Sequence, residues 1–138
     1  MTVTLTDEGT GRLAYDITGV ASVVAGAQGA IANPFGCSVH IVKAYLLVKT
    51  KAVAAGQLSI GIAATAATLS NDIWTATAMN GQTEGSVYNC FADTTAAVTV
   101  FPTAVWTSAL FLTFSGTVAS LAGFTGTLFL EVVRTPAA

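Results

Sequence analysis

The chain has 138 residues, a formal net charge of −2, and 9% charged residues against 53% in the hydrophobic class. About a quarter of the residues of an ordinary soluble domain are charged, so this composition excludes intrinsic disorder, which needs many charges and few apolar side chains. It also excludes direct nucleic-acid binding by neutralisation of phosphates, because the five basic residues do not cluster. The length suits one domain, but so few charges are unusual on the surface of a solitary soluble protein.

The first eleven residues are rich in threonine and have no closing partner in the sequence. We expect residues 1–11 to form an N-terminal arm, either flexible or added as an edge strand to a neighbouring molecule. Residues 12–138 then form the folded domain. No basic segment followed by an apolar one occurs at the start, so we expect no signal peptide and synthesis in the cytoplasm.

From residue 12 onward, short runs of alternating apolar and polar residues are separated by Gly, Asn and Pro. This pattern is typical of all-β proteins. The expected strands are Arg12–Thr18, Val20–Ala25, Ser38–Thr50, Gln57–Ala64, Ser86–Ala92, Ala96–Phe101, Ser108–Gly116 and Thr125–Thr135. Eight short strands with one long loop, residues 64–85, predict a single-domain antiparallel β-sandwich or jelly roll.

The strand Ser38–Thr50 is apolar on both of its faces. Because side chains alternate between the two faces of a strand, we expect one face to lie in the core, with His40 at its edge. The side chains of this face are Val42, Ala44, Leu46 and Val48. The other set mixes aliphatic, aromatic and basic side chains: Ile41, Lys43, Tyr45, Leu47 and Lys49. The last strand repeats this arrangement with Phe129 and Glu131 facing outward.

Several strands with two apolar faces exceed what a small sandwich can hide, so we expect the chain to associate with itself through its sheet faces. Mixed amphipathic surfaces of this kind are typical of contacts with other proteins. The predicted interface residues are Thr2, Thr4, Leu5, Ile41, Lys43, Tyr45, Leu47, Phe129 and Glu131.

Three aromatic residues are candidates for a second role. Within the long loop, we expect Trp74 to anchor the loop by packing. The alternative is a carbohydrate-binding module in which Trp74, Tyr88 or Trp106 offers a flat platform to a sugar.

The sequence gives little sign of catalysis. His40 is the only histidine, which is too few for the usual multi-histidine metal site, and no nucleophile elbow of the form G-x-S-x-G occurs. We expect no enzyme activity, no metal and no cofactor, although Asp72 and Glu84 leave a calcium site or a glycosidase pair open. Cys37 and Cys90 match no metal spacing, and we expect free thiols, with a disulfide as the alternative.

A membrane partner is also not expected. Residues 94–130 carry no charge, but Pro102 and several glycines interrupt them, and no run of about 18 apolar residues exists.

The order of several segments resembles that of a known kind of protein. NPFG (33–36) precedes a strand with AYLLV, LSIGIAATAATLSNDIW (58–74) leads to GSVYN, and SALFLTFSG (108–116) precedes a closing GTLFLEVVR (126–134). This order is similar to that of small virion proteins of tailed bacteriophages, the capsid decoration, cement or head-fibre proteins.

The resemblance implies a structural protein on the capsid surface of a virion, with the major capsid protein as its partner and a homotrimer as its common form. It implies that the protein stabilises the head against internal DNA pressure, and it brings no catalytic residues. A tail or baseplate component is the structural alternative. In each case, binding at many lattice points lets modest contacts add up.

Overall fold

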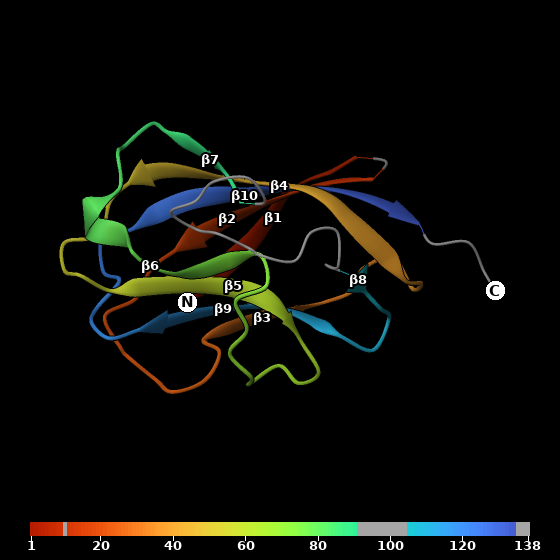
Figure 1. Ribbon diagram of the computed structural model, residues 1–138, viewed down its shortest axis with the longest axis horizontal. Coiled ribbons are helices and arrows are strands. Elements are labelled where there is room, and N and C mark those ends of the chain that lie inside the picture. The colour runs from red at the N-terminus through yellow and green to blue at the C-terminus, as the bar shows by residue number, and fades with distance from the viewer. Residues whose placement is uncertain (10, 91–104, 135–138) are drawn as a thin grey trace.

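The computed structural model describes residues 1–9, 11–90 and 105–134, with the backbone alone for residues 4–9. Two antiparallel sheets are stacked face to face with the core between them (Figure 1). The expected all-β sandwich is therefore confirmed.

The larger sheet has six strands in the order β1-β2-β10-β4-β7, and β8 also pairs with β4. Their bounds are β1 Thr2–Gly9, β2 Arg12–Thr18, β10 Thr125–Arg134, β4 Val39–Thr50, β7 Val87–Asn89 and β8 Val105–Trp106. The smaller sheet has the order β3-β9-β5-β6. Its strands are β3 Gly29–Ala32, β9 Phe111–Thr117, β5 Gln57–Ala63 and β6 Trp74–Ala78, and a 3₁₀ turn, η1, covers Met79–Gly81.

The order of the strands is that of a jelly roll. The eight strands other than β1 and β8 make two sheets of four, β2-β10-β4-β7 and β3-β9-β5-β6. The chain crosses repeatedly from one sheet to the other, so strands distant in sequence become neighbours. In this way β10, near the end of the chain, lies between β2 and β4 and carries their outward residues into one surface.

The predicted strands agree with the structure for β2, β4, β5, β7, β9 and β10, with shifts at their ends. The predicted strand Val20–Ala25 is wrong, because this segment is a loop in which Val23 and Val24 are exposed. The prediction also missed β1, β3, β6 and β8. The predicted strand Ala96–Phe101 lies outside the described residues.

Residues 2–9 form an edge strand of the chain's own sheet and not a free arm. Strand β1 pairs with β2 from Thr2 opposite Thr18 to Gly9 opposite Arg12. The turn between them uses Gly11 at φ 73, where a Cβ would lie 2.8 Å from the carbonyl oxygen of Val132. Only glycine adopts this backbone without strain, so the turn is built for a close approach to β10.

The assignment of faces along the first half of β4 is also wrong. Ile41 and Val39 are completely buried, whereas Val42 is only half-buried. The cause is a β-bulge: Lys43 pairs with Glu131 and Ile41 with Val132, so Val42 is the extra residue. One extra residue reverses the alternation, which places Ile41 in the core and removes it from the predicted interface.

The NPFG segment makes the turn that leads into β4. The side-chain oxygen of Asn33 accepts a hydrogen bond from the Phe35 amide at 2.7 Å, an Asx-type turn. Its side-chain nitrogen donates to the carbonyl oxygens of Cys37 and Trp106 at 2.9 and 2.8 Å. Asn33 thereby ties the start of β4 to β8, which pairs with it.

The segment predicted as one long loop is divided by β6 and η1. Residues 64–73 remain a loop, which returns to β5 through a hydrogen bond from the Ile73 amide to the Ile60 carbonyl at 3.0 Å. Ile73 and Trp74 are fully buried at its end, which agrees with the expected packing anchor at Trp74.

Candidate functional site

The site considered first is the solvent side of β2, β10 and β4, called here the outer face. Alternation along these strands separates the core side chains from those of this face. The core set is Leu13, Tyr15, Ile17, Leu128, Leu130, Val132, Ala44, Leu46 and Val48. The outer face is formed by Arg12, Ala14, Asp16, Thr127, Phe129, Glu131, Lys43, Tyr45, Leu47 and Lys49.

The pairing of the three strands arranges most of these residues in rows. The charged row contains Arg12, Glu131 and Lys43, and the aromatic row contains Ala14, Phe129 and Tyr45. The carboxylate row contains Asp16, Thr127 and Leu47. Each row crosses the strands β2, β10 and β4 in that order, so the strand pairing fixes which residues of the face are neighbours.

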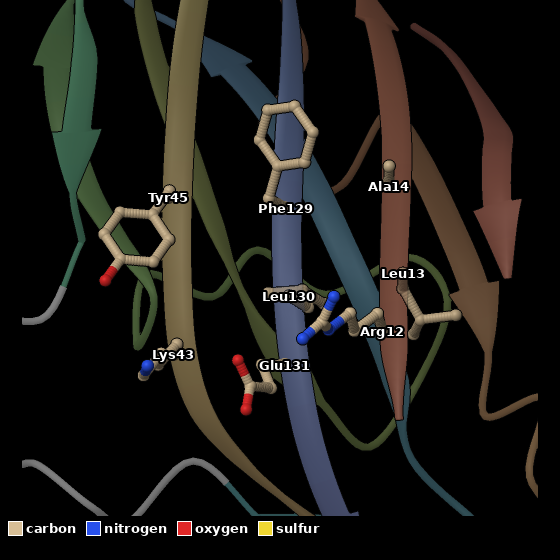
Figure 2. Close-up of a pocket in the computed structure, with 8 residues that line it drawn as sticks. All are labelled: Arg12, Leu13, Ala14, Lys43, Tyr45, Phe129, Leu130 and Glu131. Carbon is tan, nitrogen blue, oxygen red and sulfur yellow. The ribbon is translucent and has the colours of Figure 1, made fainter. Parts of the chain in front are cut away.

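A depression of about 270 Å³ lies between the charged and aromatic rows. Figure 2 shows the Arg12 side chain reaching from β2 toward β10, and the Glu131 carboxylate between β10 and β4. The rings of Phe129 and Tyr45 stand on neighbouring strands above it in this view. Phe129 is 40% exposed although it lies in the middle of a strand, so its ring is available for contact.

A polar network closes the other side of the face. The Asp16 carboxylate accepts a hydrogen bond from the Thr127 hydroxyl at 2.6 Å and another from the Lys49 ammonium at 3.1 Å. The Thr127 bond is the largest cause that lowers the pKa of Asp16 below 3.8, and the Lys49 bond and charge lower it further. Lys49–Asp16 is the only ion pair in the described part of the chain, so Arg12, Glu131 and Lys43 make none there.

The predicted interface residues divide into four groups. Lys43, Tyr45, Leu47, Phe129 and Glu131 come together on the outer face, as the alternation indicated. Ile41 is buried instead, and Thr2 is exposed on β1. Thr4 and Leu5 lie opposite Asp16 and Tyr15 in the β1–β2 ladder, and their side chains are outside the described part.

Lys49 was placed on this side of its strand but not among the predicted interface residues. The remaining members of the face were missed by the sequence analysis: Arg12, Ala14, Asp16 and Thr127. The alternation in RLAYDIT already separates Arg12, Ala14 and Asp16 from the apolar residues of that strand. The sequence does not indicate which strand pairs with β2, so nothing in it places these residues beside those of β10.

The aromatic residues proposed as a sugar platform do not offer flat faces to solvent. Trp74 and Trp106 are both completely buried, and the Trp106 indole donates a hydrogen bond to the Leu110 carbonyl at 3.0 Å. Tyr88 is half-buried, meets Trp74 edge-on at 5.8 Å between ring centroids, and accepts a hydrogen bond from the Thr83 amide. These three residues serve packing, so the alternative of a sugar platform at the two tryptophans is wrong.

The other chemically active side chains are spread through the fold. His40 is half-buried on β4 between Val105 and Val133. Cys37 and Cys90 are not joined by a disulfide. Among the described residues, no group of three or more His, Cys, Asp or Glu side chains is placed to hold a metal ion. No helix of that part is long and apolar enough to cross a membrane.

A second exposed apolar area lies where three loops meet at one end of the sandwich, at the left of Figure 1. This loop end comprises residues 19–24, 51–56 and 117–124, joined by hydrogen bonds from Leu121 to Val20 and from Val53 to Ala122. Val53 is 85% and Val118 71% exposed. Val118 also has a φ of 72, which is a strained conformation for a β-branched residue.

Comparison of the chain with protein-family models, curated proteins and solved structures gives no match.

Proposed function

We propose that the chain is a structural protein of a bacteriophage particle: a capsid decoration or cement protein that works as an assembly on the head. The observation that carries this proposal is the outer face, where Phe129, Tyr45 and Leu47 present apolar surface in the middle of a sheet. A contiguous apolar area on a protein with so few charges favours a partner that covers it. The order of sequence segments, which is similar to that of small phage virion proteins, supplies the kind of particle.

We place attachment to the major capsid protein at the loop end. The N-terminal arm expected for residues 1–11, which could have provided this attachment, is for the most part strand β1 of the chain's own sheet. The loop end instead presents Val53 and Val118 to solvent, and the strained backbone of Val118 is typical of functional positions. Many copies on a lattice would make contacts of this modest size sufficient.

The same observations also agree with a tail or baseplate protein, because a neighbouring protein would cover the exposed apolar face there as well. The order of the sequence segments favours the head. We do not propose the carbohydrate-binding alternative, because Trp74 and Trp106 are buried in the core and offer no ring face to a sugar. We therefore propose a structural role without catalysis.

Two measurements on phage particles test the proposal. Mass spectrometry of purified virions of the phage that encodes the chain should detect it, and a virion reconstruction should place it on the head. Added to heads that lack the chain, the purified wild-type protein should co-sediment with them, whereas Val53→Asp should bind at least about tenfold more weakly because a buried charge has no partner at such a contact.

The matched control is Ala32→Asp, at an exposed residue of β3 that lies opposite Phe111, at the other end of β9 from the loop end. It should bind heads like the wild type. Absence of the chain from the virion contradicts the proposal, and density on the tail replaces the head assignment with the tail one. Equal loss of binding in Val53→Asp and Ala32→Asp contradicts the loop end as the docking surface.

A further inference from the structure

The outer face has a pattern of charges that fits a second copy of itself. We propose that two copies pack face to face through it, related by a two-fold axis that crosses β2, β10 and β4 along the aromatic row. This pairing rests on the proposed assembly role and names the partner that covers the face. In a two-fold contact the same patch meets itself, so each residue must suit the one that symmetry sets against it.

One orientation of the two-fold axis is disfavoured by charge. If the axis runs parallel to β10, every row faces the same row of the partner. Glu131 then opposes the partner's Glu131, and Arg12 opposes the partner's Lys43. Like charges set against each other across an interface are strongly unfavourable.

The orientation across the strands resolves this conflict. Each strand then lies over its own copy in the opposite direction, and the charged row faces the partner's carboxylate row. Because Arg12 and Asp16 are both on β2, on either side of Ala14, Arg12 opposes the partner's Asp16. Arginine and carboxylate form the strongest hydrogen-bonded pairs at interfaces.

The other residues of the two rows suit the same arrangement. Glu131 opposes the partner's Thr127, which is a hydroxyl and not a second acid. Lys43 opposes the partner's Leu47, where its aliphatic stem has an apolar surface to cover. The face thus pairs with itself without a repulsive contact in these rows.

The shape of the face agrees with this axis. The Phe129 ring extends away from the charged row in Figure 2, and the depression of about 270 Å³ lies between this ring and Glu131. The axis turns the partner's Phe129 ring toward that depression. The small side chain of Ala14 beside it leaves room, and aromatic rings set side by side in this way are typical anchors of an interface.

Cysteine cross-linking of the full chain tests the orientation directly. We expect the variant Arg12→Cys/Asp16→Cys to form a disulfide between two copies on mild oxidation. Four residues along one strand are about 13 Å apart, which is too far for a disulfide within one copy. The matched control is Arg12→Cys/Lys43→Cys, which would link two copies only if the axis ran parallel to the strands.

Sedimentation velocity provides a second readout that does not depend on cysteines. Phe129→Asp should raise the dimer dissociation constant at least about 30-fold, as loss of a central anchor does. Val53→Asp at the loop end should leave it unchanged. Circular dichroism of each variant shows whether the sheet is intact, since Phe129 is already exposed and its replacement leaves the core complete.

The outcomes separate the two proposals. A cross-link in the Arg12/Asp16 pair alone, with dissociation by Phe129→Asp, supports the two-fold pairing. A cross-link in the Arg12/Lys43 pair, a trimer without a cross-link, or a wild-type monomer overturns it. A cross-linked dimer that is absent from virions leaves the pairing intact and overturns only the proposed function.

Discussion

At the scale of single residues, the hydrogen bonds to Asp16 have a consequence for the effect of pH on stability. The Thr127 hydroxyl and the Lys49 ammonium both favour the charged carboxylate, so the pKa of Asp16 is lower in the folded chain than its ordinary value of 3.8. A lowered pKa stabilises the fold above the unfolded value and loses that effect as the pH falls through the folded one. Asp16 is part of the outer face, so this local effect bears on the surface proposed to pair.

The first prediction concerns Thr127→Val, which keeps the shape of a buried side chain and removes the largest cause of the shift. In dilute solution this variant should be less stable than the wild type at pH 7, and the difference should shrink as the pH falls below 3.8 toward the lowered pKa. Urea unfolding at a series of pH values measures it. A difference that stays constant down to pH 2 would show that the loss comes from packing and not from the carboxylate.

The second prediction concerns glycines that differ in their surroundings. A Cβ on Gly61 would lie 2.7 Å from the amide nitrogens of Asn71 and Asp72, because the loop of residues 64–73 crosses β5 there. Gly61→Ala should therefore cost about 1–3 kcal/mol, the usual range for overpacking. Gly81→Ala is the control, since nothing lies within 4 Å of its Cβ, and thermal unfolding of both variants checks the difference. Equal melting temperatures would contradict the described path of the loop.

At the scale of elements, the bulge in β4 decides which residues belong to the core. The sequence around it is apolar at nearly every position from Val39 to Val48, so both alternations look acceptable. Only the pairing with β10 shows where the extra residue sits. This is the physical reason why Ile41 was expected on the surface and lies inside.

The third prediction tests that bulge. Ile41 is completely buried and Val42 is half-buried, so Ile41→Ala should cost about 2–5 kcal/mol, and Val42→Ala clearly less. Chemical denaturation of both variants at the same pH measures the two costs. If Val42→Ala proved the more damaging change, the strand would follow simple alternation and the bulge would be absent.

The sequence allowed the prediction of those strands that carry their own signals. β4, β5, β9 and β10 combine β-branched and aromatic residues with turn residues at their ends, and these strands were found. Val20–Ala25 also contains three valines but pairs with no strand, and β3 instead holds the edge position beside β9. β6, with the sequence WTATA, was missed although Trp and Thr favour strands, because it lies inside the segment that was interpreted as one long loop.

The candidate site was predictable in part for the same reason. Tyr45, Leu47, Phe129 and Glu131 follow from alternation within β4 and β10. Arg12 and Asp16 join them only because the jelly-roll order sets β2 beside β10. Contacts between strands more than a hundred residues apart are a property of the topology, which no local pattern indicates.

At the scale of the whole molecule, the fold buries most of the apolar side chains of its strands, but in the described part of the chain it leaves two apolar surfaces exposed to solvent. The outer face and the loop end lie on different parts of the sandwich (Figure 1). We propose a second copy as the partner of the first surface and a shell as the partner of the second. A single small domain would then have the two contacts that an assembled layer requires. Phe129→Asp should weaken the pairing of two copies, and Val53→Asp should weaken binding to heads without changing the pairing.

The central claim is that the outer face is covered in the working form of the protein. Sedimentation equilibrium of the wild-type chain at neutral pH, over a wide range of concentrations, tests it most directly. We predict a mass that rises with concentration to twice the 13.9 kDa of one chain, or to a higher multiple. A mass of 13.9 kDa that persists at millimolar concentration would contradict the claim.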